Sequence, residues 1–285
     1  TLVCTEPRQR MSDLPLSDQE ISAFFECLEE RVGVRLDLSK KYLLFARLQA
    51  LSLEANYPSV GDFVRFLNRS RHTSWHDAFA ALTTNETMFF RDPAFFRTLQ
   101  TRVLPALIRM RAGEKRLRIW SAAASSGQEA YSVAMMIRLH FPEVAKWEID
   151  ILGSDVSHPI LARARAAVFS ESEINRGLPT AYRSQFFKHL GASRYQLLEG
   201  IRSMVRFETF NLMGNAYPPE RYDLIFLRNV LIYFSKENKS HILEKIAVSL
   251  AHDGGMLFLG GTESIKAPEK FDVDLQSEWT VYTKR

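Results

Sequence analysis

Residues 119–129 read Ile-Trp-Ser-Ala-Ala-Ala-Ser-Ser-Gly-Gln-Glu: an apolar run, a turn of small residues, and then the start of a helical pattern. Small side chains let a ligand approach the main chain, and the first turn of a helix offers N–H groups without intrahelical partners. The dinucleotide pattern GxGxxG is absent, because Gly127 is the one glycine in the turn. The stretch therefore argues against a pyrophosphate ligand, which needs the closest main-chain approach. A tightly packed strand-to-helix connection without a ligand is the alternative.

Strand and helix patterns alternate from about residue 113 onward. Strand-like apolar runs fall at residues 117–120, 147–153, 205–209, 222–227, 255–259 and 278–284, the last as an edge strand. Helical patterns follow the first two runs at residues 129–139 and 159–167. This alternation predicts βαβ units and a mainly parallel sheet. Between residues 169 and 204 it lapses into short, partly β-like pieces, which predicts an inserted subdomain.

A purely helical pattern precedes this region, since residues 16–82 carry apolar side chains at helical spacing. Ser17 and Glu20 form a capping box, and Gly33 is placed to end the first helix. Ser39 is placed to cap a second helix. We therefore predict a helical domain over residues 13–82, a linker over 83–112, an α/β domain over 113–285 and the inserted subdomain over 169–204.

Composition narrows the class of protein. The chain has 285 residues, of which 46% are apolar and 25% charged, so it can bury a large core without disulfides. Its two cysteines do not suffice for a disulfide framework or a four-cysteine zinc site, and we expect no metal. No apolar run reaches 18 residues, and residues 1–12 lack the apolar core of a signal peptide, so we expect neither a membrane protein nor secretion. The net charge of +4 is compatible with an acidic partner.

Polar residues follow several of the predicted strands. Asp155 ends the second strand, where it can accept both ribose hydroxyls of a nucleoside or cap the next helix. Asn211 follows the third strand, as an adenine contact or a turn residue. Arg228 and Asn229 follow the fourth, with Tyr233 on a helical turn beyond; the alternative pairs Arg228 with a carboxylate and buries Tyr233 in the core. Because parallel strands bind ligands at their carboxyl ends, these positions favour a nucleoside site there.

The segment at residues 83–91 reads TTNETMFFR and lies between the two predicted domains. It combines hydrogen-bonding side chains with two phenylalanines and an arginine, and domain junctions are favoured ligand sites. We expect the segment to contribute to the site. An ordinary hinge anchored by Phe89 and Phe90 is the alternative.

The segments TTNETMFFR, WSAAASSGQEAYS, GSD, NL and LRNVLIYF, in this order after a helical domain, resemble the CheR family of chemotaxis receptor methyltransferases over residues 16–284. The resemblance implies a doubly wound, Rossmann-like methyltransferase domain that uses S-adenosylmethionine, joined to a small all-helical N-terminal domain and carrying an inserted antiparallel β subdomain. It also implies methylation of glutamate side chains of bacterial chemoreceptors to glutamyl methyl esters, with S-adenosylhomocysteine as the other product, in chemosensory adaptation. Such an enzyme is cytoplasmic and joins membrane receptor arrays through its substrate.

The resemblance also implies roles for individual residues. It assigns Arg91 and Tyr233 to the catalytic centre. It assigns cofactor contacts to Asn85, Thr87, Arg91, Ala123, Gly127, Glu129, Asp155, Asn211, Leu212, Leu227, Arg228 and Asn229. A glutamate has a reference pKa near 4.3 and is ionised at neutral pH, so this reaction needs no general base. The enzyme must instead position the carboxylate, and positioning can supply roughly 7–11 kcal/mol at best.

The implied partner is the cytoplasmic domain of a chemoreceptor, whose methylation helices carry glutamates. Arg35, Lys40, Lys41 and Arg47 offer a basic docking face for it. The tight hairpin predicted at residues 190–193 is shorter than in relatives that grip a receptor's C-terminal tail, which argues against docking of that tail by strand addition.

Three other functions remain to be weighed. A nucleic-acid or small-molecule methyltransferase has the same fold, but Arg228-Asn229-Val230 stands where an Asn/Asp-Pro-Pro-aromatic motif would follow the fourth strand. We therefore expect no nucleic-acid partner. A signalling module would bind the cofactor or its product without turnover. A nicotinamide dehydrogenase is disfavoured by the single glycine of the first turn.

Overall fold

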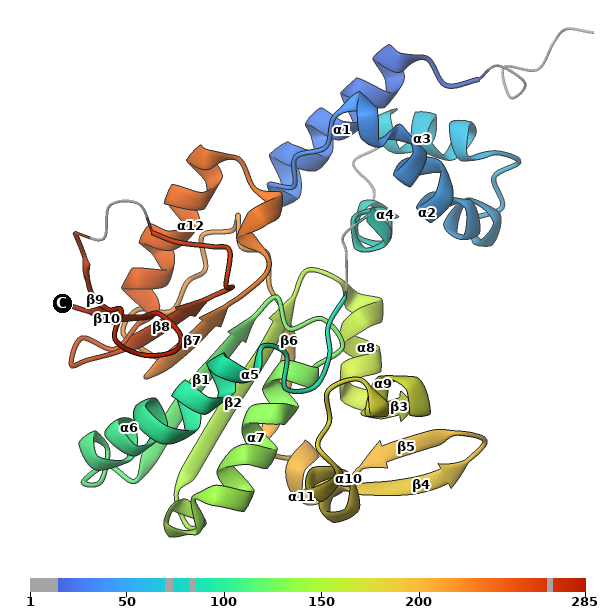
Figure 1. Cartoon of the computed structure of the whole chain (residues 1–285). Helices are drawn as coiled ribbons and strands as arrows, with labels where there is room; N and C mark the ends of the chain where they lie inside the picture. The colour runs from blue at the N-terminus through green and yellow to red at the C-terminus, as the bar shows by residue number, and fades with distance from the viewer. Residues whose placement is uncertain (1–14, 70–73, 83–85, 266–268) are drawn as a thin grey trace, which may run out of the picture. The chain divides into compact units, whose positions relative to one another are not determined.

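The structure is a computed structural model that describes residues 15–69, 74–82, 86–265 and 269–285 (Figure 1). The chain divides into two compact units, Thr1–Thr84 and Asn85–Arg285. Asn85, one of the predicted cofactor contacts, lies outside the described residues. Within the described residues no helix is long and apolar enough to cross a membrane.

The first unit is helical, as predicted. Its elements are α1 (Asp18–Val32), the 3-10 turn η2 (Leu38–Lys40), α2 (Lys41–Glu54), α3 (Val60–Arg69) and α4 (Ser74–Leu82). The capping box of Ser17 with Glu20 is confirmed, and Gly33 ends α1 in the left-handed conformation. The predicted cap at Ser39 is wrong. Asp37 accepts the Ser39 N–H at 2.8 Å and begins η2, because its carboxylate is two residues upstream of that donor.

A mixed sheet forms the centre of the second unit. Among the described residues seven strands follow the order β6-β2-β1-β7-β8-β10-β9. Their bounds are β1 (Arg116–Ala122), β2 (Glu148–Asp155), β6 (Val205–Thr209), β7 (Leu224–Leu227), β8 (Met256–Leu259), β9 (Phe271–Asp274) and β10 (Val281–Lys284). The first five are parallel and β10 is antiparallel to both neighbours. The last predicted strand is therefore not at the edge, because β9 pairs with its outer side.

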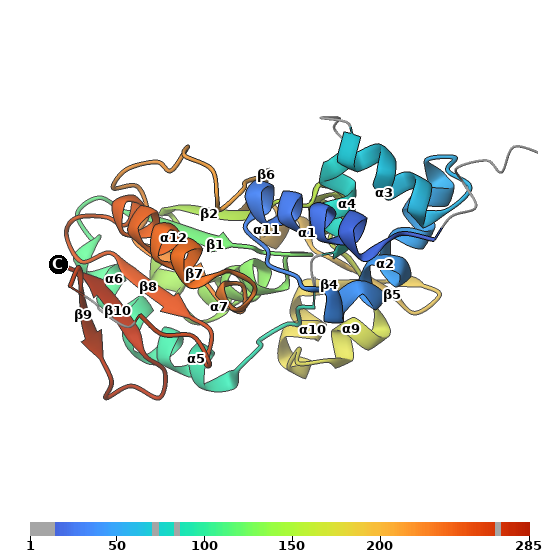
Figure 2. The ribbon, with the colours of Figure 1, turned by 90° about the horizontal axis from the view of Figure 1, so that it is seen from above.

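Helices cover both faces of this sheet (Figure 2). Their bounds are α5 (Pro93–Thr98), the π-helix η3 (Leu99–Val103), α6 (Leu104–Met110), α7 (Gln128–His140), η4 (Pro142–Val144), α8 (His158–Ala166), η5 (Leu231–Tyr233) and α12 (Lys236–Ser249). Most of the predicted linker is helical: residues 93–110 form helices and belong to the second unit.

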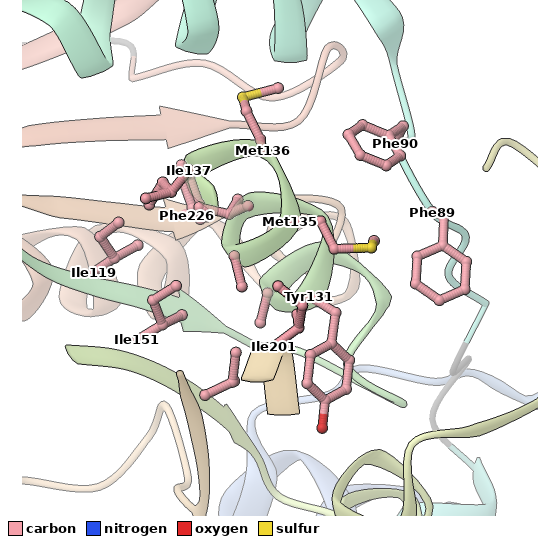
Figure 3. Packing of buried hydrophobic residues seen from close by; sticks show 14 of the residues in the cluster. Phe89, Phe90, Ile119, Tyr131, Met135, Met136, Ile137, Ile151, Ile201 and Phe226 are labelled. Atoms are coloured by element: carbon pink, nitrogen blue, oxygen red, sulfur yellow. The ribbon is translucent and has the colours of Figure 1, made fainter. Parts of the chain in front are cut away.

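Side chains alternate along the strands between two apolar cores. Ile119 and Phe226 face the core formed with α5, α6, α7 and α8 (Figure 3). Trp120 and Ile225 face the core formed with α12. A strand exposes successive side chains to opposite faces, so one strand supplies both cores. The doubly wound α/β fold predicted from the sequence is confirmed.

A second, antiparallel sheet with strand order β3-β5-β4 interrupts the chain between α8 and β6. Its region contains β3 (Val168–Ser170), α9 (Glu171–Asn175), α10 (Thr180–Phe186), β4 (Phe187–Gly191), β5 (Arg194–Leu197) and α11 (Glu199–Arg202). Phe169, Tyr182 and Phe186 join the core that α7 forms with the main sheet. The inserted antiparallel sheet is therefore packed on the main sheet and its helices.

Candidate functional site at the carboxyl ends of the strands

The turn between β1 and α7 presents its main chain at the carboxyl edge of the sheet. Ala123, Ser125 and Gly127 all have positive φ, at 60°, 52° and 89°. A Cβ on Gly127 would lie 2.8 Å from the Phe207 ring, so the turn requires glycine there for space as well as for conformation. Gly127 is also the N-cap of α7, whose first N–H groups lack intrahelical partners. The turn therefore has the open main chain that the small residues predicted.

Asp155 ties this turn to the end of β2. Its carboxylate accepts the N–H of Ser125 and the N–H of Ser157, each at 3.0 Å. Burial raises the pKa of the Asp155 carboxyl, while hydrogen bonds from the main chain of Ser157, Ser125 and Val156 act in the opposite direction. The helix-cap alternative is wrong for this residue, because Ser157 is the N-cap of α8. Three main-chain donors leave the carboxylate one lone pair for a ligand hydroxyl.

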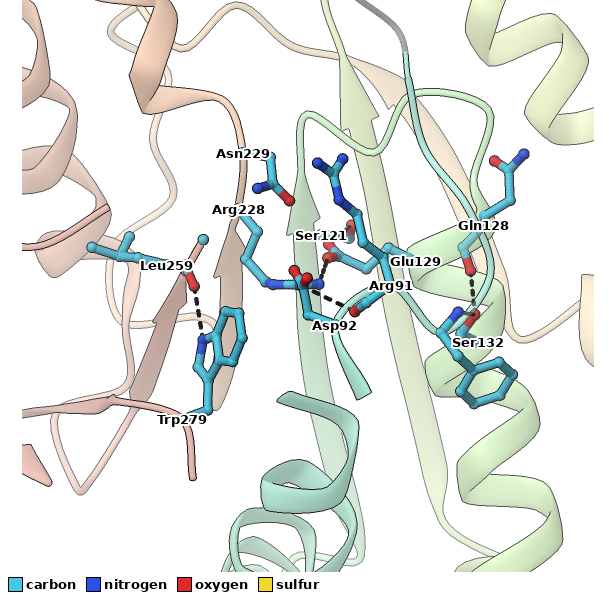
Figure 4. Close-up of polar contacts among 12 residues, drawn as sticks. Arg91, Asp92, Ser121, Gln128, Glu129, Ser132, Arg228, Asn229, Leu259 and Trp279 are labelled. Carbon is cyan, nitrogen blue, oxygen red and sulfur yellow. Dashed lines mark hydrogen bonds and ion pairs between the residues drawn. The ribbon is translucent and has the colours of Figure 1, made fainter. Parts of the chain in front are cut away.

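Glu129 and Arg228 form a buried ion pair behind the strand ends (Figure 4). Arg228 Nη1 donates to Glu129 Oε2 at 2.5 Å, and Nη2 donates to Asp92 Oδ2 at 2.6 Å. The other oxygen of Glu129 accepts the Ser121 hydroxyl at 2.8 Å. The Arg228 side chain is 1% exposed. The structure therefore shows the alternative predicted for Arg228: its side chain pairs with carboxylates.

The segment at residues 86–92 is packed on the rest of the second unit. The Phe89 ring is fully buried, with ring centroids 4.9 Å from Phe169 and 5.6 Å from Phe187. The Phe90 N–H donates to the Ser132 hydroxyl of α7 at 3.1 Å. Phe89 and Phe90 thus anchor the segment, as expected for the alternative of a hinge held by these two rings. They also fix the position of Arg91, which follows them.

That residue, Arg91, points its guanidinium away from the buried ion pair, on the side where Asn229 lies (Figure 4). Nη1 donates to the Glu86 carbonyl oxygen at 3.1 Å. Among the described residues Arg91 forms no salt bridge, whereas Arg228 forms two; the Glu86 carboxylate, whose pKa is lowered chiefly by Arg176, also interacts with the charge of Arg91. Arg91 is thus the arginine that can receive a negatively charged ligand group.

The remaining predicted residues lie in loops at the same edge. Asn211 Oδ1 accepts the Met213 N–H at 2.9 Å, which makes it the turn residue of the alternative as well as a ligand candidate. Leu212 and Leu227 are buried in the α12 core. Tyr233 packs half-buried against that core at the end of η5, as its alternative proposed. Thr87 is half-buried in the segment before Phe89.

One residue that organises the edge, Glu263, was not predicted. Its Oε2 accepts the N–H groups of Asn229 at 2.9 Å and Gly260 at 2.7 Å, and Oε1 accepts that of Ile232 at 3.2 Å. Asn229 itself has a φ of 58°. Glu263 therefore holds the loop after β7 to the end of β8. The isolated acidic residue in Gly-Gly-Thr-Glu carries no pattern that would have indicated this.

The donor set at this edge fits S-adenosylmethionine. Acceptors for hydroxyl or ammonium groups are present at Asp155 and Glu129. Arg91 is a cation that forms no salt bridge among the described residues, and side-chain amides lie at Asn211 and Asn229. The turn at residues 123–127 offers main-chain groups to the rest of the molecule. These are the complements of a ribose, an amino acid moiety and an adenine.

A doubly wound sheet with this donor set at its carboxyl edge defines a methyltransferase that uses S-adenosylmethionine. Residues 85–280 match the family described as CheR methyltransferase, SAM binding domain, and residues 19–83 match the CheR methyltransferase all-alpha domain. The chain belongs to the CheR methyltransferase family. The family and the cofactor predicted from the sequence are both confirmed.

Curated relatives match this chain over nearly their whole length. The chemotaxis protein methyltransferase of Vibrio parahaemolyticus is 37% identical over 268 residues, which cover 92% of this chain and 96% of the relative. Chemotaxis protein methyltransferase 1 of Vibrio cholerae has the same identity and coverage. Chemotaxis protein methyltransferase 1 of Pseudomonas aeruginosa is 35% identical over 271 residues, 93% of this chain and 98% of the relative.

Proposed function

We propose that this chain is a protein-glutamate O-methyltransferase that methylates specific glutamate side chains of chemoreceptors in chemosensory adaptation. Its relatives are named chemotaxis protein methyltransferases. The observation that carries the proposal is Arg91, a cation that forms no salt bridge among the described residues and lies at the edge that carries the proposed cofactor contacts. A carboxylate substrate is the chemical complement of that cation.

The proposed site divides the work among few residues. S-Adenosylmethionine supplies, when bound, a methyl group on a positively charged sulfur. Thr87, Asp155, Asn211 and Asn229 would hold the cofactor together with the main chain of residues 123–127, and Asn85 belongs to this set by resemblance. Arg91 orients a carboxylate, either that of the cofactor or that of the substrate, and Tyr233 shapes the face where transfer occurs. None of these side chains is a histidine or a cysteine, in keeping with a substrate that is already ionised.

The first unit is the proposed receptor-docking part. Arg35, Lys40 and Lys41 are exposed there. Arg47 differs, because its Nη1 donates to the Leu82 carbonyl oxygen at 2.6 Å and so links α2 to α4. We therefore place the docking face on the three exposed residues. The receptor is a membrane protein, so we propose that the enzyme acts in the cytoplasm at receptor arrays.

The receptor's C-terminal tail is not part of this proposal. The turn between β4 and β5 consists of Ala192 and Ser193 alone, because Gly191 already pairs with Arg194. This short hairpin argues against tail docking by strand addition. Binding of a receptor-tail peptide at micromolar affinity would contradict that expectation.

The test is transfer of radiolabelled methyl groups from S-adenosylmethionine to receptor-containing membranes, followed by treatment with alkali. We expect label on a receptor band that alkali releases, because an ester is hydrolysed by base. Label that resists alkali would indicate N-methylation, and competition by DNA or RNA would indicate a nucleic-acid acceptor. No label, with calorimetric binding of S-adenosylhomocysteine intact, would favour a sensing module.

Replacing Arg91 is the sharpest mutational test of the site. We expect Arg91→Ala to lower methyl transfer by about a hundredfold, the size of effect seen when one fixed polar group is removed from an active site. Arg102→Ala is the control, because Arg102 is half exposed and pairs only with Asp274 among the described residues. Near-normal turnover of Arg91→Ala would remove Arg91 from the catalytic role.

A further inference from the structure

The turn that carries Arg91 has an unfavourable backbone. Phe90 has a φ of 49° and Asp92 a φ of 63°, so the residues on both sides of Arg91 are left-handed. For a bulky residue such as phenylalanine this conformation is a genuine outlier. Such backbone persists only when the surrounding structure holds it in place, and it is concentrated at functional sites. The question is which groups hold this turn.

The upstream side of the turn is held by packing and by one hydrogen bond. Ser132 accepts the Phe90 N–H, and its own hydroxyl donates to the Gln128 carbonyl oxygen at 2.7 Å. Gly177 receives the Phe89 main chain, since a Cβ on Gly177 would lie 2.2 Å from the Phe89 oxygen. This side is therefore fixed to α7 and to the inserted region.

The downstream side is held by Arg228. Its Nη2 donates both to the Arg91 carbonyl oxygen at 3.2 Å and to Asp92 Oδ2 at 2.6 Å. No side-chain capping bond of Asp92 is formed at the start of α5, so its carboxylate serves this contact and no helix cap. One guanidinium nitrogen of Arg228 thus binds both the main chain of Arg91 and the side chain of Asp92.

Arg228 is itself immobilised. Glu129 holds Nη1, the guanidinium carbon lies 3.8 Å from the centroid of the Phe95 ring, and Trp279 lies on another side at 5.4 Å. Its Nε is buried and has no hydrogen-bond partner among the described residues. A side chain packed in this way cannot reach a ligand, although it follows directly from a strand of the site.

We infer that Arg228 is a positioning residue for Arg91. Arg228, Asp92 and Glu129, here called the linker clamp, fix the left-handed turn and thereby aim the Arg91 guanidinium at the carboxyl edge of the sheet. This inference rests on the proposed role of Arg91 in methyl transfer. It gives the Arg228 side chain an effect on turnover that does not depend on its own contact with substrate or cofactor.

Asp92→Gly tests the clamp without disturbing the fold. Glycine adopts a φ of 63° without strain, removes the carboxylate and leaves Arg228 its bond to Glu129. We expect methyl transfer to fall by about tenfold to a hundredfold, as misplacement of a catalytic group by an ångström does. Asp92→Asn should restore most of the loss, because asparagine tolerates the left-handed region and keeps an acceptor for Nη2.

A double-mutant cycle with Arg91→Lys separates positioning from general destabilisation. If the clamp acts through Arg91, Asp92→Gly should lower methyl transfer only slightly in protein that already carries Arg91→Lys. The guanidinium that the clamp would position is absent from that protein. Full additivity of the two losses, or wild-type turnover of Asp92→Gly alone, would refute the inference.

Amide hydrogen exchange gives a readout that does not depend on the receptor. In Asp92→Gly we expect faster exchange over residues 86–96 and unchanged exchange over β1. If wild-type protein transfers no methyl group to any receptor, the proposed function fails, yet exchange still tests the clamp. Unchanged exchange over residues 86–96 would then overturn it.

Discussion

Carboxylates that accept main-chain N–H groups shape the loops of this site. Asp155 gathers the turn after β1 onto the end of β2. Glu263 gathers the loop after β7 onto the end of β8, through Asn229, Ile232 and Gly260. A carboxylate is suited to this task because it has only acceptors, two oxygens with two lone pairs each. The two side chains therefore define where the ligand-facing main chain lies.

Glu263→Gln is predicted to disturb this loop through a single atom. One amide nitrogen replaces an acceptor oxygen, so at least one of the three N–H groups faces a donor. We expect a loss of about 1–3 kcal/mol in the free energy of unfolding, the cost of an unsatisfied polar group. Urea denaturation followed by tryptophan fluorescence measures it, together with a fall in methyl transfer.

The matched control is Glu244→Gln. Glu244 is exposed on α12 and makes no hydrogen bond or ion pair within the described part of the chain. An equal free energy of unfolding for the two variants would show that the hydrogen bonds of Glu263 do not stabilise the fold. Glu263 would then have no role in organising the loop.

At the scale of the element, the β4–β5 hairpin contains two residues that do not suit its turn. Ala192 and Ser193 have φ values of 47° and 53°, the conformation of a two-residue turn with both central residues left-handed. Asparagine and glycine are the preferred pair there. We expect the double replacement of Ala192→Asn and Ser193→Gly to stabilise the protein by about 0.5–1 kcal/mol, because the strain is removed.

The measurement is the urea midpoint, with methyl transfer as a check. The exposed turn lies outside the proposed site, so turnover should stay at the wild-type level. A lower midpoint would indicate that the turn has another conformation than the one described.

Elements were more predictable than contacts. The capping box at Ser17 and the alternation of strands and helices are local patterns, and the structure confirms them. β9 escaped prediction because a short strand with two aspartates lacks an apolar run. The partners of Arg228 escaped because Asp92 and Glu129 lie 136 and 99 residues away in sequence. The left-handed Phe90 escaped for a related reason: tertiary contacts impose it against local preference.

At the scale of the whole molecule, ion pairs link strands that are distant in the chain. Asp150 of β2 contacts Arg206 of β6 at 2.8 Å and Arg221 at 3.4 Å. Burial alone would raise the pKa of the Asp150 carboxyl, but the hydrogen bonds and charges of these arginines outweigh it and lower the pKa below 3.8. A carboxyl whose pKa is lowered in the folded state stabilises the fold at any pH above its pKa in the unfolded chain. This contribution is lost as the pH falls through the lowered pKa of the folded state.

Asp150→Asn is therefore predicted to remove a pH-dependent part of the stability. At pH 7 the variant should lose roughly 1–3 kcal/mol relative to the wild type. The gap should narrow as the pH falls below about 4, where the carboxyl of the unfolded chain binds a proton, and close as the pH falls through the lowered pKa of the folded state. Urea midpoints at a series of pH values test this. A gap that is independent of pH would show that the ionised form gains nothing from the two arginines.

The position of Arg228 also has a consequence for the order in which the molecule acquires activity. Arg228 contacts Asp92, Glu129 of α7 and Trp279. Two of these neighbours, Asp92 and Trp279, lie 187 residues apart in the sequence. Contacts of such long range cost loop-closure entropy, which slows folding. When denatured protein is returned to native conditions, we expect the helical circular dichroism signal to recover before methyl transfer does. The lag between the two reports the time needed to close the chain around Arg228.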